Sequence, residues 1–333
     1  MNNKPNYQPP YTLTPTILNL VAQISELVGR MTALTGNAKS LQLRRVNRIR
    51  TIQGSLAIEG NTLSREQMTA ILAGKRIIAP PREIQEVRNA LLAYGRFEQW
   101  QPYVEADLLD AHRDLMTGLI NEAGVYRSGG VGVMSGEHII HMAPPAERVP
   151  LLMSDLFHWM VSADIHPLIL SSIFHYEFEF IHPFADGNGR VGRLWQSFIL
   201  TNWNELFANI PVESLVHAHQ AEYYRALQNS TDQTDCAPFI EFMLKMILEA
   251  VTYTPQVAPQ VTPQVGSLLN IVKGEMDRES LQEALGLKDR KSFRERYLKP
   301  AIAEELLEMT RPDKPHSRLQ KYRLTDKGQQ WLA

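Results

Sequence analysis

The sequence predicts a mainly helical, all-α fold that carries a small β-hairpin, followed by a small C-terminal domain of the winged helix-turn-helix type. Apolar residues recur at three- and four-residue steps in most segments between residues 14 and 252, which is the spacing of one helix face. Glycine-punctuated β-type runs occur in residues 124–150 and predict the hairpin. A repeated Pro-Gln-Val stretch then separates a short helix-turn-helix pattern from the rest of the chain.

Composition limits the classes of protein to consider. The 333 residues suggest two or three domains, and a hydrophobic content of 44% supports real cores. The net charge of −2 gives no global basic field for nucleic acid. A single cysteine, Cys236, excludes an internal disulfide and favours a reducing compartment. No apolar run approaches the roughly 18 residues of a spanning helix, and the N-terminus lacks a signal-like apolar region. We therefore expect a cytoplasmic protein without a membrane partner.

Residues 1–103 are expected to form an N-terminal helical region. Thr14 followed by Pro15 predicts a helix start, and the apolar residues of 17–31 give that helix one apolar face. A second helix is expected from about Ala38 to Ile58, with Gly60-Asn61 as its end. Helices are also expected through residues 64–100, where they serve as scaffold.

The second helix carries Ser55 and Glu59, four residues apart and so on one face. Taken alone, Glu59 is an ordinary surface carboxylate at a helix end, where the helix dipole disfavours it slightly. A function for this pair needs support from elsewhere in the chain.

Residues 104–252 are expected to form the main helical domain. A helix over 104–122 leads to a β-hairpin that turns near Ser135-Gly136, with Val133, Met134 and Ser135 before the turn. The run HPLILSSIFHYEFEF is apolar all round, which indicates a helix at the centre of the domain. Further helices are expected around residues 194–203, 221–230 and 238–252.

The stretch IHPFADGNGRVGRLW, residues 181–195, combines residue types that suit phosphate chemistry. The Gly187-Asn188-Gly189 turn can direct backbone N–H groups at an anion, and the helix that follows presents its positive N-terminus there. Arg190 and Arg193 are three apart, so both can clamp phosphate oxygens from one helix face.

Two further side chains of this stretch suit the same chemistry. Asp186 is a hard oxygen ligand of the kind that holds Mg²⁺ between phosphates. His182 precedes the loop and can accept a proton from an attacking hydroxyl near neutral pH. Each residue alone has an ordinary structural explanation, whereas the combination does not.

The stretch resembles the Fic-family motif, H-x-F-x-D/E-G-N-G-R-x-x-R, at every defined position. The matching residues are His182, Phe184, Asp186, Gly187, Asn188, Gly189, Arg190 and Arg193. The resemblance implies that residues 104–252 form a Fic catalytic core and that the enzyme is a protein adenylyltransferase. It would use ATP and Mg²⁺ to transfer AMP to a Ser, Thr or Tyr hydroxyl of an unidentified target protein or of the chain itself.

The resemblance also implies roles for individual residues. His182 is the base, Asp186 holds the magnesium, and the nucleotide is bound by Phe184, Gly187, Asn188, Gly189, Arg190, Arg193 and Tyr224. Tyr223 or Tyr224 packs on adenine by this likeness, while a plain core position for either tyrosine stays open. The hairpin with Val133, Met134 and Ser135 is a flap that covers the nucleotide and holds the target peptide by strand addition.

Ser55, Glu59 and Gly60 match the Fic inhibitory motif, S/T-x-x-x-E-G/N. By this resemblance Glu59 pairs with Arg193 and inhibits the enzyme, Ser55 steadies the helix, and 1–103 is the region that carries the inhibitory helix. Other activities stay open: removal of AMP, transfer of another phosphate-containing group, or a DNA-binding regulator that senses nucleotide.

The C-terminal part is expected to be a separate domain, with residues 253–265 as an extended linker and 266–333 as the winged-helix-like domain. Its helix-turn-helix pattern places a turn at 288–289 and a second helix over 289–299. A further helix to Leu307 and strands flanking 311–320 suggest a wing. Residues 266–333 hold 14 basic and 11 acidic residues. Basic residues on the second helix can contact DNA phosphates, although such domains also dock proteins or join two copies of a chain into a homodimer.

Overall fold

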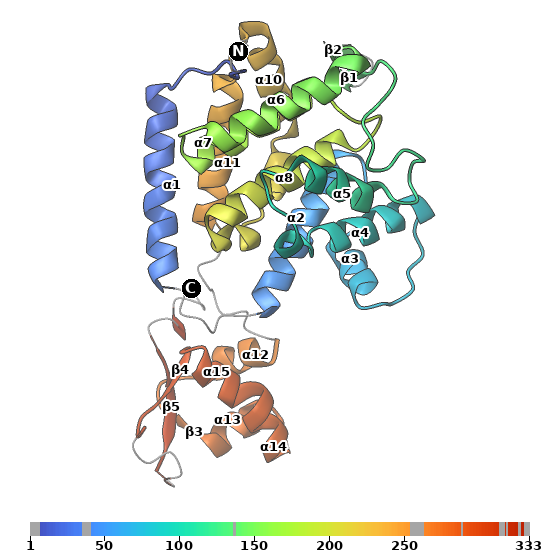
Figure 1. The fold of residues 1–333 in the computed structure, drawn as a ribbon. Coiled ribbons are helices and arrows are strands. Elements are labelled where there is room, and N and C mark those ends of the chain that lie inside the picture. The colour runs from blue at the N-terminus through green and yellow to red at the C-terminus, as the bar shows by residue number, and fades with distance from the viewer. Residues whose placement is uncertain are drawn as a thin grey trace. The chain divides into compact units, whose positions relative to one another are not determined.

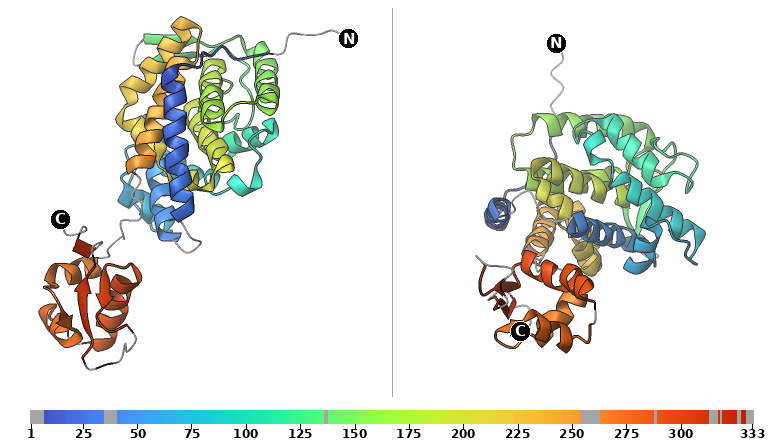
Figure 2. Two further views of the ribbon diagram at one scale, coloured as in Figure 1. Left: turned by 90° about the vertical axis from the view of Figure 1, so that its left-hand side faces the viewer. Right: turned by 90° about the horizontal axis from the view of Figure 1, so that it is seen from below.

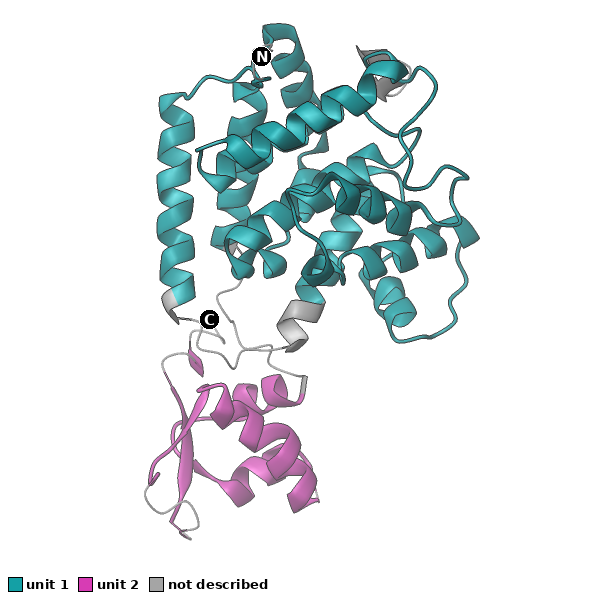
Figure 3. Ribbon diagram, in the orientation of Figure 1, with its two compact units in different colours: residues 1–254 teal, residues 255–333 magenta. Residues whose placement is uncertain are grey.

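The structure is a computed structural model that describes residues 7–34, 41–135, 138–253, 263–287, 289–312, 317, 319–325 and 328–329. Two compact units divide the chain, Met1–Thr254 and Pro255–Ala333 (Figure 3). The expected start of the second helix at Ala38 and the hairpin turn at Gly136 lie outside the described residues. In the described parts of the chain, no helix has the length and apolar character needed to cross a bilayer.

The described part of unit 1 consists of helices and one hairpin, which confirms the all-α prediction (Figure 1). Before the hairpin come α1 (Pro15–Leu34), α2 (Leu41–Ile58), α3 (Arg65–Leu72), α4 (Pro81–Ala93), η1 (Phe97–Gln99) and α5 (Glu105–Met116). The hairpin pairs β1 (Gly132–Ser135) with β2 (His138–Met142). After it come η2 (Ala146–Arg148), α6 (Val149–Ser162), α7 (Pro167–Ile181), α8 (Asn188–Trp203), η3 (Glu205–Asn209), α9 (Val212–Ala218), α10 (Gln220–Gln233) and α11 (Ala237–Tyr253).

Helices α7 and α8 form the centre of unit 1. All but two residues of α7 are buried, because its apolar residues occur on every face and must be covered by neighbouring helices. α7 packs against α8 and α11, and α1 lies along α11 on the outside of the unit (Figures 1 and 2). The N-terminal helices therefore share one core with the helices that follow the hairpin.

The predicted helix starts are confirmed by their capping bonds. The Thr14 hydroxyl accepts a hydrogen bond from the Ile17 N–H at the start of α1. Ser64 and Gln67 form the reciprocal capping box at the start of α3. α5 ends earlier than the expected residue 122, at Met116, where Gly118 adopts a left-handed conformation with φ of 75°.

The hairpin is antiparallel, with Val133 opposite His141 and Met134 opposite Ile139. The register shifts between Val133 and Met134, which marks a bulge in the first strand. The hairpin lies where the sequence placed it, and Val133, Met134 and Ser135 all belong to β1.

Unit 2 folds around its own apolar cluster, which includes Leu268, Leu281 and Phe293. Its helical segments are α12 (Pro263–Ile271), α13 (Arg278–Ala284), α14 (Arg290–Phe293), η4 (Arg294–Leu298) and α15 (Lys299–Ala303). A three-stranded antiparallel sheet with the order β3-β5-β4 completes it, from β3 (Met276–Asp277), β4 (Leu307–Met309) and β5 (Lys321–Leu324).

Two expectations for this unit are wrong. The linker is predicted to end at residue 265, but α12 already begins at Pro263. The first turn of a helix tolerates proline, so Pro263 does not prevent this start. The helix expected to reach Leu307 stops at Ala303: Glu305 has a φ of 55°, and Leu307 begins β4. The two-residue strand β3 was not predicted, since so short a strand leaves no alternating pattern.

Candidate functional site

The motif loop joins the end of α7 to the start of α8 and reverses the chain between them. His182 ends α7 in the left-handed conformation with φ of 49°, and its N–H donates to the Phe178 carbonyl at 2.9 Å. The side chain of Asn188 accepts from the Phe184 N–H at 2.9 Å and donates to the Phe184 carbonyl at 2.8 Å. Asn188 therefore fixes the shape of the loop, and its side chain is buried and engaged with the protein itself.

Two glycines of the loop are required by close contacts. Gly187 has a φ of 86°, and a Cβ on it would lie 2.6 Å from the Met116 sulfur. A Cβ on Gly189 would overlap the Glu59 carboxylate and lie 2.8 Å from a guanidinium nitrogen of Arg193. Glycine at these two positions therefore lets the side chains of Met116, Glu59 and Arg193 approach the start of α8.

Phe184 lies in the core and not on a nucleotide surface. Its ring is fully buried and stacks on the His112 ring, with centroids 3.6 Å apart and planes at 3°. The expected contact of this side chain with nucleotide is therefore not supported by its position. Because Phe184 stands between Pro183 and Ala185 in the loop, its buried ring anchors the loop to the core.

His112 supports the same loop from α5. Its Nδ1 accepts the Gly124 N–H at 2.8 Å, so the ring proton belongs on Nε2, which lies 3.0 Å from the Asp186 carbonyl oxygen. Burial lowers the pKa of His112 to about 4, and the ring is neutral at pH 7. Sequence reasoning missed this residue, because nothing in the α5 sequence distinguishes it from a packed histidine.

Arg127 is a second residue that sequence reasoning missed. Its guanidinium donates to the carbonyls of His182 at 2.7 Å, Gly129 at 2.9 Å and Pro144 at 2.6 Å. Its own N–H donates to the Pro183 carbonyl at 2.9 Å. One buried side chain thus ties the end of α7 to both segments that flank the hairpin.

Replacing Arg127 with alanine is expected to lower the free energy of unfolding by roughly 2–3 kcal/mol, because buried carbonyls lose a charged donor. Thermal or denaturant unfolding of the purified variant measures the change. Arg127→Lys is the matched control: it keeps the charge but cannot reach three carbonyls and should recover only part of the loss. Wild-type stability of Arg127→Ala would contradict the assignment.

Asp186 lies in a network of charges at the start of α8. Arg190 donates to Asp186 at 2.8 Å and lies 3.4 Å from Glu86, while Arg82 contacts Asp186 at 3.2 Å and Glu86 at 3.4 Å. The Asn61 amide donates to Glu86 at 2.9 Å, so the network reaches the end of α2. The Asp186 side chain is 41% exposed, whereas that of Arg190 is 5% exposed.

Arg193 is buried and paired with the predicted regulatory residues of α2. Its Nη2 donates to Glu59 Oε1 at 2.6 Å and to the Ser55 carbonyl at 3.1 Å, and its Nε donates to the Ser55 hydroxyl at 3.2 Å. Burial would lower the pKa of Arg193, but the Glu59 carboxylate beside it holds that pKa above its usual value. The structure thus brings together Ser55, Glu59 and Arg193 from segments 134 to 138 residues apart.

Of the two adjacent tyrosines, Tyr223 belongs to the core. It is fully buried, and its hydroxyl lies 3.1 Å from Nε2 of His175. Tyr224 is half-buried, and Glu59, Arg193 and Glu179 all influence its pKa, which burial raises. Tyr224 is thus less buried than Tyr223, and its contact with a nucleotide stays a prediction.

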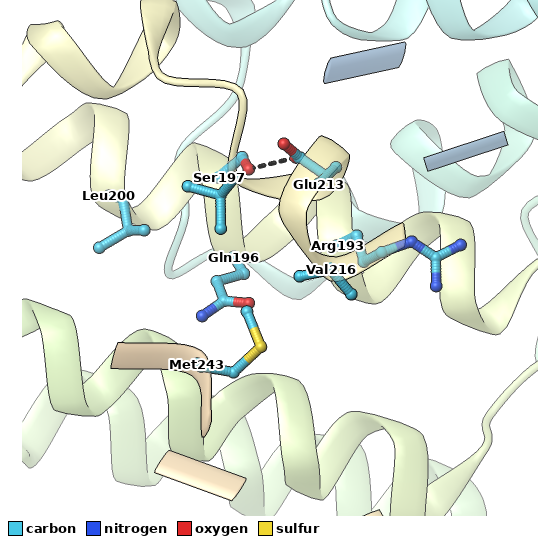
Figure 4. Close-up of a pocket in the computed structure, with 8 residues that line it drawn as sticks. Arg193, Gln196, Ser197, Leu200, Glu213, Val216 and Met243 are labelled. Carbon is cyan, nitrogen blue, oxygen red and sulfur yellow. Dashed lines mark hydrogen bonds between the residues drawn. The ribbon is translucent and has the colours of Figure 1, made fainter. Parts of the chain in front are cut away.

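A small cavity of about 10 Å³, room for one water molecule, lies behind Arg193. Its lining includes Gln196, Ser197, Glu213 and Met243, and Figure 4 shows the guanidinium of Arg193 directed away from Gln196 and Met243. The Ser197 hydroxyl donates to Glu213 at 2.5 Å. This cavity is too small for a nucleotide and faces the wrong side of Arg193.

The described residues contain no group of three or more His, Cys, Asp or Glu side chains able to hold a metal by themselves. Asp186 is a partly exposed carboxylate beside a helix N-terminus, which suits a magnesium ion that takes its other ligands from phosphates and water. The expected flap residues Val133, Met134 and Ser135 lie on β1, and their side chains are outside the described part of the structure.

Family comparisons match both units of the chain. Residues 100–200 match the Fic/DOC family, and residues 263–325 match the C-terminal domain of Fic-like proteins, described as filamentation induced by cAMP protein Fic-like. Among solved structures, a Fic family protein from Desulfovibrio desulfuricans G20 is 55% identical, with a TM-score of 0.74 over 96% of this chain and 99% of that one. Fic-1 from C. elegans, 24% identical with a TM-score of 0.56, covers 72% of this chain and 71% of its own, and supports the fold alone.

Curated relatives named protein adenylyltransferase Fic also match. The Nematostella vectensis protein is 30% identical over 206 residues, which is 58% of this chain and 45% of that protein. The Aedes aegypti protein is 29% identical over 212 residues, 59% of this chain and 39% of that protein. The chain thus spans less than half the length of these curated relatives.

Proposed function

Since this chain belongs to the Fic family, we propose that it is a protein adenylyltransferase, which transfers AMP from ATP to a hydroxyl group of a protein. The observation that carries the proposal is the loop between α7 and α8. It brings His182, the Gly187-Asn188-Gly189 turn and the buried Arg193 to one helix start. The curated relatives named protein adenylyltransferase Fic support the same activity.

The triphosphate is proposed to lie at the start of α8. The first N–H groups of a helix have no partner within the helix, and they favour an anion together with the helix dipole. Arg193, once free of Glu59, is the cation for the outer phosphates, and Asp186 is the ligand for Mg²⁺. When bound, Mg²⁺ neutralises phosphate charge and so favours the departure of pyrophosphate.

The proposed reaction is an in-line displacement at the α-phosphorus. The oxygen of a Ser, Thr or Tyr hydroxyl forms a bond to that phosphorus, and the bond to the β-phosphate oxygen breaks. His182 accepts the hydroxyl proton, and pyrophosphate leaves with the electron pair of the broken bond. His182 must be neutral to act, which an ordinary histidine is near pH 7.

The intact mass of the full chain after incubation with ATP and Mg²⁺ tests the proposal. Self-modification adds the mass of one or more AMP groups, whereas transfer of another phosphate-containing group adds a different mass. An unchanged mass for both the wild type and the Glu59→Gly variant, with no labelled protein in a lysate, would reject adenylyl transfer. Loss of the added AMP on removal of ATP would instead indicate the reverse activity.

Replacing Arg82 with alanine is expected to strengthen Mg²⁺ binding, because Arg82 competes for the Asp186 carboxylate. An exposed pair contributes about 0.2–1 kcal/mol, so the dissociation constant should fall by up to roughly fivefold. Calorimetric titration of Mg²⁺ into the protein with a non-hydrolysable ATP analogue measures it. Arg65→Ala, which removes an exposed arginine bonded to Gln53, is the control and should change nothing. Weaker binding in Arg82→Ala would place Arg82 among the phosphate ligands instead.

We propose a second role, DNA binding, for unit 2. Four basic residues on α14 and η4 are exposed: Arg290, Lys291, Arg294 and Arg296. One of these positive charges is partly neutralised, because Arg290 contacts Glu279 at 3.2 Å. Gel-shift assays on random duplex DNA should show salt-sensitive binding that the fourfold alanine variant loses. Equal mobility of DNA with either protein would reject this role.

A further inference from the structure

A buried carboxyl group, Glu179, lies directly beneath the proposed base. It precedes His182 by three residues on the last turn of α7, and its Oε2 lies 3.7 Å from Nδ1 of His182. Catalytic hydrogen bonds are often longer before substrate binds. A small movement would therefore bring Glu179 and His182 within hydrogen-bond distance. The Glu179 side chain is 9% exposed, whereas that of His182 is 19% exposed.

Packing alone does not explain why a carboxyl group occupies this buried position. Among the described residues, Glu179 Oε1 has no hydrogen-bond partner, although it is buried. Gly192 on α8 faces it, and a Cβ there would lie 3.1 Å from Glu179 Oε1. A buried carboxyl without compensating bonds lowers stability, so a purely structural position would favour an apolar side chain.

Charged and titratable groups face Glu179 from four helices. They are Glu59 after α2, His175 and His182 of α7, Arg193 of α8, and Tyr223 and Tyr224 of α10. Burial raises the pKa of Glu179 to about 7, Arg193 opposes that rise, and Glu59 adds to it. Burial lowers the pKa of His175 to about 3, so His175 stays neutral and supplies no charge at pH 7.

We propose that Glu179 is a positioning residue for His182, and that it links the base to the Arg193–Glu59 pair. Its carboxylate faces Nδ1 of the imidazole and holds the proton there, which leaves Nε2 to accept the proton of the target hydroxyl. When that proton arrives, the carboxylate stabilises the imidazolium that forms. This inference rests on the proposed transfer reaction for its role, but its geometry can be tested without that reaction.

The link to Glu59 is electrostatic, because the charges of Arg193 and Glu59 both act on the pKa of Glu179, in opposite directions. Glu59 contacts Arg193 at 2.6 Å, and its negative charge disfavours a second carboxylate nearby. In the nucleotide-free chain, loss of the Glu59 charge should lower the pKa of Glu179, so that the carboxyl group is ionised over a wider pH range beside His182.

The test compares Glu179→Gln and Glu179→Asp with their parent, the full chain carrying Glu59→Gly. Nitrogen-15 NMR of the histidine rings, with His182→Asn to assign the signal, reports the tautomer and the pKa of His182 without any turnover. Glu179→Gln should mix the two tautomers and lower the pKa of His182, because the opposite charge is gone. Glu179→Asp should retain part of the effect. Restoring Glu59 to the parent should raise the pH at which the Glu179–His182 pair titrates.

Kinetics supply the second measurement. Glu179→Gln should lower kcat for AMP transfer by roughly tenfold, as expected for a group that orients a base through a hydrogen bond, with KM for ATP unchanged. Glu177→Gln is the matched control: it is a buried carboxyl on the same helix, but it faces Tyr7 and Cys236, and it should leave the His182 signal unchanged. Thermal unfolding of each variant verifies the fold, and Glu179→Asp carries the test if the glutamine variant does not fold.

The outcomes separate this inference from the proposed function. An unchanged tautomer and pKa of His182 in a folded Glu179 variant would overturn the positioning role, even where AMP transfer is observed. A changed tautomer with no transfer in any variant would retain the positioning role and reject the adenylyltransferase. A rise in KM for ATP with constant kcat would mean that Glu179 acts on nucleotide binding, which also overturns the proposal.

Discussion

Replacing Glu59 with glycine is expected to raise the rate of AMP transfer by roughly 5–150-fold, the range of a coupling free energy of about 1–3 kcal/mol. The measurement is the initial rate of incorporation of labelled AMP into the chain at saturating ATP and Mg²⁺. The expected gain follows from the competition for Arg193, which Glu59 now holds at 2.6 Å.

The pair suits an inhibitory contact because its two members are buried unequally. The Arg193 side chain is 2% exposed and cannot lose its partner without another anion, since an uncompensated buried charge costs about 3–5 kcal/mol. The Glu59 side chain is 34% exposed and can turn into water. The γ-phosphate of ATP is such an anion, so we expect nucleotide and Glu59 to exclude one another at the same guanidinium.

Two further variants test how the rate of AMP transfer depends on the contacts of Arg193. Ser55→Ala should raise the rate only weakly, because the Ser55 carbonyl still accepts from Arg193 after the hydroxyl is lost. Arg193→Ala should stay inactive even with Glu59→Gly, because it removes the group that binds phosphate as well as its inhibitor. Glu66→Gln, a change at an exposed carboxylate of α3, is the control and should match the wild type. If Glu59→Gly is no faster than wild type, Glu59 is an ordinary helix-end residue and regulation lies elsewhere.

The sequence was informative where the site is local. The loop from His182 to Arg193 is contiguous, so its turn, its helix start and its glycines could be predicted before the structure was known. The periodic helices of unit 1 and the position of the hairpin were predictable for the same reason, since each depends on a short segment. The pairing of Glu59 with Arg193 required the resemblance to a known motif, because no local pattern joins residues so far apart.

The supporting residues were not predictable, because their roles arise from tertiary contacts. Arg127 and His112 come from different segments, and only the folded chain brings them to the motif loop. Glu179 was visible in the sequence only as a charge within an apolar helix, and its partners became clear when α7 and α8 packed together. Phe184 is the converse case: its place in the motif suggested a ligand contact, which stays a prediction, whereas the structure shows that its ring is buried in the core.

Replacing His182 with alanine is expected to reduce AMP transfer by on the order of 10²–10⁴-fold, the usual contribution of a general base. The parent should be Glu59→Gly, in which a loss of that size can be measured. The physical reason is that no group then accepts the proton of the attacking hydroxyl. A protonated hydroxyl is a weaker nucleophile toward the α-phosphorus.

ATP affinity should stay at the parent value, and this separates a base from a binding residue. The phosphates are assigned to the start of α8 and to Arg193, whereas His182 ends α7 and is assigned to the hydroxyl of the target. Calorimetric titration with a non-hydrolysable ATP analogue measures the affinity, and labelled ATP measures the transfer. His158→Ala, which changes an exposed histidine of α6, is the matched control and should alter neither quantity. Transfer by His182→Ala at the parent rate would reject the base, and a parallel fall in affinity and rate would place His182 among the nucleotide ligands.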